Sequence, residues 1–478
     1  MGDDFTSGHR IRDGALPSLA SAALQPEVDT IVVGGGISGL TSAYRLGGNR
    51  RVVVLEQAPA AGGNAKSASW GDLEYAIGAA YFCEPDRGDE LDTLYRELGV
   101  MDRSLPVPKG EVFFGDRLIE GFWEGNANPS ERDDIVRIAR EWRNLVEHRY
   151  PDIPWTPETG WTEDEYEAAD LLPFSKHLDA IDAPPAVRRF CKHYCWSSFG
   201  APPEEVSTYA ALNFITAEFG VIRALPGGNA GVAKALLEKL TGRGVNVATG
   251  QLAVSVKNRD DGVEVVALRG DEVLRYHAKS CVFAAPRFMA AHIVDGFPAD
   301  RLEIVAGMKW RAYLVANVLL SKRPRHEWYD VYRLDELDPA TMGWTDLILA
   351  DFVKEERSKR TAVITAYRAL PFDGGRALLG TIEQYDEHRS TLLADLAPKL
   401  AALGLDRTDI VDVNLARWGH PMVVAQPGQL SNGDLERLSA PFGRIAFAHQ
   451  DRFGTPAIES AIAAGFAAAK EVVGFANA

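Results

Sequence analysis

The segment spanning residues 28–56, VDTIVVGGGISGLTSAYRLGGNRRVVVLE, constrains the fold more than any other part of the chain. Short apolar runs at 29–33 and 51–55 predict two buried strands, and the helical spacing of apolar residues at 37–46 predicts a helix between them. A strand, a helix and a strand in this order form a β-α-β unit with parallel strands. The chain therefore contains a domain of the α/β class.

Three glycines follow the first strand at the positions of the G-x-G-x-x-G fingerprint. Gly34 suits a tight turn, Gly36 lets a pyrophosphate approach the backbone, and Gly39 lets the helix pack closely on the strand. The free N–H groups at the start of that helix favour phosphate. Glu56 ends the second strand, where a carboxylate accepts hydrogen bonds from ribose hydroxyls and disfavours the 2′-phosphate of NADP. These residues predict a dinucleotide site.

A second glycine pair, Gly62 and Gly63, follows the acid-terminated strand. The whole segment resembles the pattern GGGxxGLxxAxxL…VxVLExxxxxGG of flavoproteins of the glutathione reductase type. This resemblance implies that the dinucleotide is FAD rather than NAD.

Later segments resemble the flavin amine oxidase superfamily in the order in which that family carries them. They are LPGG at 225–228, two alternating strand patterns at 245–256 and 263–268, and SCVFAAP at 280–286. The family's corresponding valine meets the adenine, so the resemblance implies this contact for Val254.

The segment 442–465, FGRIAFAHQDRFGTPAIESAIAAG, resembles the superfamily's closing motif. A helix that starts near Pro456 would direct its first N–H groups at the N1 and C2=O edge of a reduced flavin. Asp451 is expected to hold a ribityl hydroxyl because the family's residue is acidic, and Gln450, which fits the register of the motif better, is the alternative. The residues expected to bind FAD are Gly34, Gly36, Ile37, Ser38, Gly39, Glu56, Gln57, Gly62, Gly63, Asn64, Val254, Asp451, Pro456, Ala457 and Ile458.

The expected architecture is an α/β Rossmann-like FAD-binding domain built from discontinuous segments, plus an α+β substrate domain of amine oxidase type. Residues 1–27 are expected to form an N-terminal arm. The FAD-binding domain is expected to comprise residues 28–105, 205–290 and 410–478, and the substrate-binding domain residues 106–204 and 291–409.

Within the superfamily, four segments resemble bacterial spermidine dehydrogenases: FTSGHRIRDG at 5–14, WRAYLVANVLLSKRP at 310–324, RWGHP at 417–421 and GRIAFA at 443–448. The resemblance implies an FAD-dependent enzyme that oxidises a C–N bond of an amine, polyamine or amino acid by hydride transfer to flavin N5. Proteins with the same FAD motifs that act on C–C bonds, such as phytoene desaturases and protoporphyrinogen oxidases, are the alternative. A flavin-dependent isomerase or a non-catalytic flavoprotein is the third hypothesis.

Three residues are candidates for catalysis. Trp418 lies where the superfamily often places an aromatic wall beside the flavin, and such a face attracts an ammonium by about 0.5 to 2 kcal/mol. His420 is a candidate acid or base near neutral pH. Many superfamily oxidases hold a lysine where this chain has Val315 and Ala316, and Lys309, some six residues earlier, is the nearest substitute. The electron acceptor is therefore left open between oxygen and another acceptor, and the absence of that lysine makes a dehydrogenase that uses another acceptor an alternative to an oxidase.

The composition restricts partners and compartment. With 51 Lys and Arg against 67 Asp and Glu, the net charge of −16 disfavours nucleic acid as a partner. The same acidic excess either attracts cationic small molecules or simply keeps the chain in solution. Four cysteines in so long a chain, Cys83, Cys191, Cys195 and Cys281, predict free thiols and the cytoplasm. The run C-x-H-x-C at 191–195 predicts a buried helical face rather than a metal site. No membrane span is expected, and a homodimer is left open.

Overall fold

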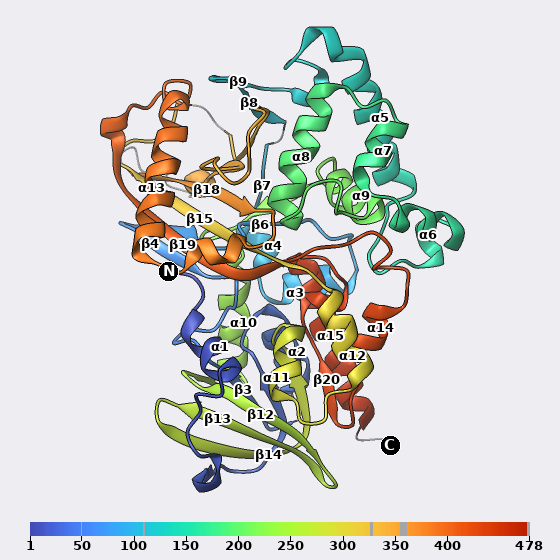
Figure 1. Cartoon of the computed structure of the whole chain (residues 1–478), viewed down its shortest axis with the longest axis vertical. Coiled ribbons are helices and arrows are strands. Elements are labelled where there is room, and N and C mark those ends of the chain that lie inside the picture. Colours follow the sequence, from blue (N-terminus) through green and yellow to red (C-terminus); the bar gives the residue numbers. More distant parts are fainter. Residues whose placement is uncertain (49, 109, 326–327, 354–360, 476–478) are drawn as a thin grey trace.

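The computed structural model describes residues 1–478 apart from 49, 109, 326–327, 354–360 and 476–478. The molecule has two parts, one above the other in Figure 1, and each is built on its own sheet. The lower sheet contains the parallel Rossmann-like unit, and the upper sheet is largely antiparallel. The expected fold class is therefore confirmed.

The lower sheet is built around the predicted β-α-β unit. Its strands are β1 (Ala23–Leu24), β2 (Val28–Val33), β3 (Val52–Glu56), β11 (Asn246–Thr249), β12 (Leu252–Arg259), β13 (Gly262–Arg269), β14 (Glu272–Phe283) and β20 (Ile445–Phe447). They follow the order β11-β3-β2-β14-β13-β12, and β1 and β20 also pair with β14. The carboxyl ends of β2 and β3 lie side by side because the two strands are parallel. Such an edge is the usual binding face of an open α/β sheet.

Three helices pack beside this sheet: α2 (Ile37–Leu46), α10 (Ala230–Gly242) and α15 (Ile458–Phe475). The crossing of α2 and α15 is close because Gly465 has no side chain. A Cβ there would lie 2.7 Å from the Ser38 carbonyl oxygen and 2.8 Å from the Thr41 Cβ. The Ser42 hydroxyl donates to the Gly465 carbonyl at 3.0 Å. The last helix of the chain is thereby fixed against the first helix of the dinucleotide unit.

The upper sheet has the order β19-β15-β18-β17-β16-β8-β9. Its strands are β8 (Glu111–Phe114), β9 (Arg117–Ile119), β15 (Trp310–Leu320), β16 (Asp330–Arg333), β17 (Asp346–Leu349), β18 (Ala362–Leu370) and β19 (Ile410–Val423). A group of helices stands to one side of it in Figure 1, and α13 (Ile382–Leu396) stands to the other. That group is α5 (Arg132–His148), α6 (Glu163–Leu171), α7 (Phe174–Ala180), α8 (Pro185–Phe199) and α9 (Thr208–Ala217).

Two of the expected domain boundaries differ from this arrangement. Residues 410–423, grouped with the FAD-binding segments, form β19, which pairs with β15 along almost its whole length and so belongs to the upper sheet. Residues 208–217, grouped in the same way, form α9, which packs against α5, α6 and α7. The remaining boundaries stay a prediction.

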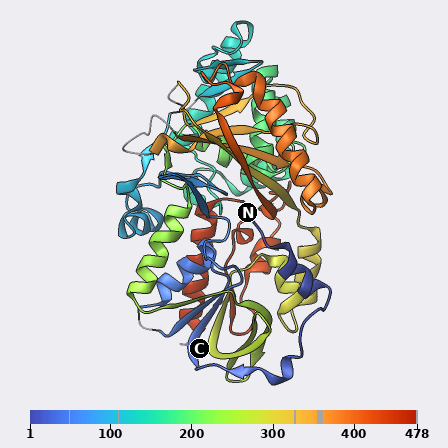
Figure 2. The same cartoon turned by 90° about the vertical axis from the view of Figure 1, so that its left-hand side faces the viewer.

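The remaining named elements are shorter. They are the hairpin β4 (Ser67–Trp70) and β5 (Leu73–Ala76), the small sheet of β6 (Tyr81–Cys83), β10 (Ile222–Ala224) and β7 (Leu105–Pro106), and the helices α1 (Phe5–Arg12), α3 (Glu90–Glu97), α4 (Val100–Arg103), α11 (Arg287–Ile293), α12 (Ala299–Gly307) and α14 (Asp434–Ser439). The arm reaches the upper sheet, because Asp3 N–H donates to Arg417 O and Gly419 N–H donates to the Asp3 carboxylate. Figure 2 shows the N-terminus at the junction of the two parts.

The crossing of α2 and α15 gives a stability prediction. Gly465→Ala is expected to lower the free energy of unfolding by about 1 to 3 kcal/mol, because the added Cβ would meet backbone and Cβ atoms that cannot move freely. Thermal and denaturant unfolding measure the loss. The control is Gly474→Ala in the same helix, where a Cβ meets nothing within 4 Å. An equal loss in both variants would contradict the packing argument.

Candidate functional site

A cavity of about 1940 Å³ runs between the two sheets. It extends from the glycine loop after β2, past the 77–81 segment, to residues of α8, α9 and the upper sheet. Sites for one small ligand commonly have roughly 300 to 1000 Å³. The cavity is therefore large enough for a dinucleotide together with a separate small substrate.

The glycine-lined end provides a cradle. Gly62 N–H donates to Gly35 O at 2.8 Å, which brings the two glycine loops side by side. A Cβ on Gly36 would have only Gly63 Cα, at 3.7 Å, within 4 Å, so it would enter the cavity rather than the protein. A Cβ on Gly39, by contrast, would lie 1.9 Å from Gly34 O. Gly36 thus leaves room for a ligand, whereas Gly39 permits helix packing.

Glu56 is held in place at the end of β3. One carboxylate oxygen accepts from Gly35 N–H and the other accepts from Ala58 N–H, both at 2.8 Å. The residue lines the cavity and is nearly buried. Each oxygen retains acceptor capacity for a further donor. This geometry suits the two adjacent hydroxyls of a ribose.

Most of the expected FAD-binding residues line the cavity, and three do not. Gly39, Val254 and Asp451 are absent from the wall. Ala253 lines it in place of Val254, because the pairing of β12 with β13 shifts register between Ala253 and Ser255. The residues that do line it are Gly34, Gly36, Ile37, Ser38, Glu56, Gln57, Gly62, Gly63, Asn64, Pro456, Ala457 and Ile458.

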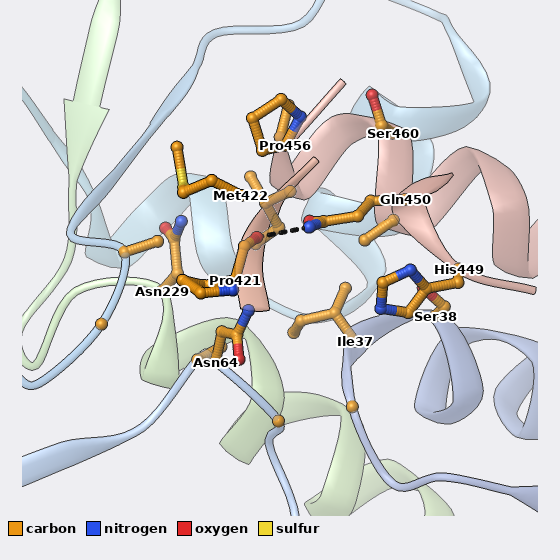
Figure 3. A pocket seen from close by; sticks show the side chains of 18 of the residues that line it. Ile37, Ser38, Asn64, Asn229, Pro421, Met422, His449, Gln450, Pro456 and Ser460 are labelled. Atoms are coloured by element: carbon orange, nitrogen blue, oxygen red, sulfur yellow. Dashed lines mark hydrogen bonds between the residues drawn. The ribbon is translucent and has the colours of Figure 1, made fainter. Parts of the chain in front are cut away.

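The structure separates Gln450 from Asp451. Gln450 lines the cavity, and its side-chain amide donates to Pro421 O at 2.7 Å (Figure 3). Asp451 is fully buried behind the wall, where it accepts from Trp310 Nε1 at 3.3 Å and from Arg287 N–H at 3.0 Å. The expectation that Asp451 reaches the ribityl chain is therefore wrong, because its carboxylate is hydrogen-bonded in the protein interior. The helix α15 begins at Ile458, two residues after the expected start near Pro456.

A row of backbone carbonyls beside the cavity is fixed by side chains from distant parts of the chain. The segment 77–81 lines the cavity, and four of its carbonyl oxygens accept such bonds. The bonds are Trp418 Nε1 to Ile77 O (2.8 Å), Tyr367 hydroxyl to Gly78 O (2.7 Å), Tyr329 hydroxyl to Ala80 O (3.1 Å) and Asn229 Nδ2 to Tyr81 O (2.8 Å). Except for Trp418, no local sequence pattern marks these donors, because they lie far apart in the chain.

The three catalytic candidates lie in different surroundings. Trp418 lines the cavity, as expected of an aromatic wall. Lys309 is not part of the wall, because its ammonium pairs with Glu205 at 2.8 Å. Val315, at the family's lysine position, does line it.

His420 also lines the cavity, but its Nε2 lies 2.7 Å from an Arg376 guanidinium nitrogen. Burial, together with the charge of Arg376, lowers the pKa of His420 to about 4. At neutral pH the ring is thus uncharged, and Nε2 accepts the bond from Arg376. This arrangement contradicts the role of a proton donor near pH 7.

The C-x-H-x-C run lies on α8. Cys191, His193 and Cys195 are all buried there, burial raises the pKa of both thiols, and His193 Nε2 bonds Asp335 O at 2.8 Å. In the part of the chain that the structure describes, no group of three metal-ligating side chains is found. Nor, over those same residues, is any helix both long and apolar enough to cross a membrane.

Comparisons with known proteins agree with this geometry. A family model described as an NAD(P)-binding Rossmann-like domain matches residues 32–98. Oxidoreductase PigB of Serratia sp. (strain ATCC 39006) is 24% identical over 95% of this chain and 76% of its own length. A probable flavin-containing monoamine oxidase A of Dictyostelium discoideum is 22% identical over 93% of this chain and 97% of its own.

Solved structures show the same fold. A putrescine oxidase variant, from a study of its cofactor binding, superposes with a TM-score of 0.71 at 18% identity, over 95% of this chain and all of that one. The chain has the flavin amine oxidase fold. A putative protoporphyrinogen oxidase from Exiguobacterium sp. 255-15 also superposes, with a TM-score of 0.66 at 14% identity, over 94% of this chain and 99% of that one. The expected fold and the resemblance to flavin amine oxidases are thus confirmed.

The contact between Arg376 and His420 gives a prediction. Arg376→Gln is expected to raise the pKa of His420 above its value of about 4, because a nearby positive charge is removed while the burial remains. Titration of the histidine ring signals by NMR measures the change. Arg389→Gln removes a surface arginine that pairs with Asp412, and serves as the control. An unchanged His420 pKa in Arg376→Gln would show that burial alone sets it.

Proposed function

We propose that the protein binds FAD noncovalently and uses it to oxidise a C–N bond of a small amine. The observation that carries the proposal is the division of one cavity into two chemically different ends. The glycine cradle and Glu56 suit a pyrophosphate and a ribose at one end. At the other end, lining residues within 146–222 and 313–367 include tyrosines, Asp152, Glu218 and Asp346, and none of them is lysine or arginine.

The residues of the first end fit FAD as the cofactor. Gly36 and Gly63 leave the cradle open, Gln450 is available to a ribityl hydroxyl, and Ile458 begins a helix whose first N–H groups have no intrahelical acceptor. No cysteine occurs in residues 410–478, so a thioether to the flavin is not expected from this segment. When bound, FAD supplies a hydride acceptor at N5.

The chain's own contribution is to position the amine and exclude water. Trp418 offers an aromatic face to a cationic or neutral amine. Its indole N–H, with the Tyr367 hydroxyl, also holds the 77–81 segment against the cavity. Only an amine that has lost its ammonium proton can release a hydride from its α carbon, and the resulting imine is then hydrolysed by water. The protein therefore needs no nucleophile of its own for this chemistry.

A C–C bond oxidation remains the second candidate function because a protoporphyrinogen oxidase-like structure shares the fold. Its substrate class carries either long apolar chains or carboxylates. Asp152 in the cavity wall would repel carboxylates, and the burial of Asp346 disfavours contact with an apolar chain. The wall thus favours the amine.

The decisive experiment mixes the purified protein anaerobically with polyamines, monoamines, amino acids, a porphyrinogen and a polyene, and follows the flavin absorbance. Bleaching by an amine is expected, and its rate is expected to rise with pH as the substrate ammonium deprotonates. Trp418→Ala is expected to slow this bleaching more than the reoxidation that follows. Bleaching by the porphyrinogen or the polyene alone would overturn the amine proposal.

Cofactor binding has its own test. Gly36→Val is expected to lose FAD with little loss of fold, because the added side chain enters the cavity rather than the protein. Chromatography of the flavin released by heat measures the FAD content. Circular dichroism measures how much of the fold is retained. The control is Gly48→Ala, where a Cβ meets nothing within 4 Å. Full FAD retention in Gly36→Val would contradict the assigned cradle.

Val315 at the lysine position gives a prediction for the electron acceptor. Reduced flavin is expected to persist in air and to reoxidise quickly with an artificial acceptor. Lys309→Met is expected to leave the oxygen reaction unchanged, since Glu205 holds its ammonium away from the cavity. Stopped-flow absorbance measures the rates at which oxygen and the artificial acceptor reoxidise the flavin. A fast oxygen reaction that disappears in Lys309→Met would show that this lysine reaches the flavin.

A further inference from the structure

The N-terminal arm crosses the cavity from one part of the molecule to the other. Its helix α1 lies beside α11 in the lower part, and the two helices are in contact (Figure 1). Gly8, His9, Ile11 and Arg12 of this helix line the cavity. At its other end, the arm is bonded to the upper sheet through Asp3. The arm therefore forms one wall of the cavity.

The end of the cavity that α1 covers is the dinucleotide end. β14 is a parallel neighbour of β2, so the carboxyl ends of these two strands lie together. A Cβ on Gly34, in the glycine loop, would lie 3.1 Å from the carbonyl carbon of Ala284, which follows β14. α11 begins three residues later, and its Phe288 and Met289 line the cavity. Because α1 packs on α11, it covers this edge of the sheet rather than the far end of the cavity.

One guanidinium joins α1 to the upper part. Arg376 lies in the short 3₁₀ helix Gly375–Leu379, which follows β18, and it donates to His9 Nε2 at 3.1 Å and to His420 Nε2 at 2.7 Å. All three residues line the cavity, and we call them the clasp. Each bond needs an imidazole nitrogen that carries no proton. Since the pKa of His420 is lowered to about 4 by burial and by the charge of Arg376, its ring meets this condition at neutral pH.

Apart from the clasp, the cavity side of α1 has little to hold it. Of the eight residues in this helix, only Ile11 is buried. Gly8 lies in the middle of the helix, where glycine is a poor helix former, and a Cβ there would meet nothing within 4 Å. Segments with few buried apolar contacts are those that open most easily in a folded protein. α1 can thus leave the cavity while the rest of the structure stays folded.

We infer that α1 is a lid that closes over bound FAD, and that the clasp holds this lid closed. The inference rests on the proposed binding of FAD and adds to it a role for the arm. A dinucleotide in the cavity would give the exposed side of α1 a surface to pack on. A ligand that binds the closed form more tightly stabilises that form, and the closed lid in turn slows release of the ligand. His9 and Arg376 are therefore positioning residues for the cofactor.

The first test measures how fast FAD leaves the purified holoprotein after dilution, from the fluorescence of the freed flavin. His9→Ala removes the arm's half of the clasp and is expected to speed release at least about 10-fold, as the loss of one hydrogen bond to a charged group predicts. Arg376→Gln is expected to act in the same direction. The matched control is Arg10→Ala, in the same helix but outside the cavity wall, which is expected to release FAD at the parent rate. Thermal unfolding of the FAD-free proteins is expected to be the same for His9→Ala and Arg10→Ala.

The second test measures amide hydrogen exchange with and without FAD, so it needs no turnover. Bound FAD is expected to slow exchange in residues 5–14 of the parent protein, and to slow it much less in His9→Ala. Exchange in α13, which lies away from the arm, is the internal reference and is expected not to change. Equal exchange of residues 5–14 with and without FAD would overturn the inference.

The remaining outcomes are also decisive. Release of FAD at the parent rate from His9→Ala would overturn the inference, and so would equal acceleration by Arg10→Ala, because the effect would then belong to the helix rather than to the clasp. Unchanged FAD release with a higher amine concentration for half-maximal flavin reduction would assign the arm to the substrate instead. A purified protein that binds no FAD would overturn the proposed function, and this inference with it.

Discussion

The absence of side chains at a few glycines allows this structure to form. Gly39 lets α2 begin directly against the end of β2, and Gly465 lets α15 cross α2 at backbone distance. Any side chain at these points would push the helices away from the glycine loop. The cavity in front of Gly36 then remains open at the carboxyl ends of two parallel strands. The nucleotide end of the cavity is therefore a consequence of helix packing as much as of the loop itself.

The second part of the molecule completes the site. The upper sheet contributes Trp418 from β19 and Tyr367 from β18, and both donate to carbonyls of the 77–81 segment that follows β5. These bonds join a segment near the glycine cradle to strands that the sequence places hundreds of residues later. The N-terminal arm makes a second connection through Asp3 and Gly419. The cavity is thus bounded by elements that hold one another in place.

The cavity wall changes character between its ends, and this change supports a function in amine chemistry. The Rossmann-like end offers backbone N–H groups and Glu56, which suit a dinucleotide. The far end offers tyrosines and carboxyl groups such as Asp346, whose charged form is costly without a cation. The excess of acidic residues in the whole chain agrees with the same preference. A positively charged substrate is the partner that both the local wall and the overall charge favour.

The sequence by itself determined the α/β unit, the glycine cradle, Glu56 and the closing helix, because each depends on spacing within a short stretch of chain. It also marked Trp418 through its family motif. Where a side chain's place depends on register or on distant contacts, the sequence was insufficient. A bulge in β12 moved Ala253 to the wall instead of Val254, and burial assigned Asp451 to the interior and Gln450 to the cavity. Only the tertiary structure decided these positions, because packing between remote segments determines which face of a strand or turn meets the ligand.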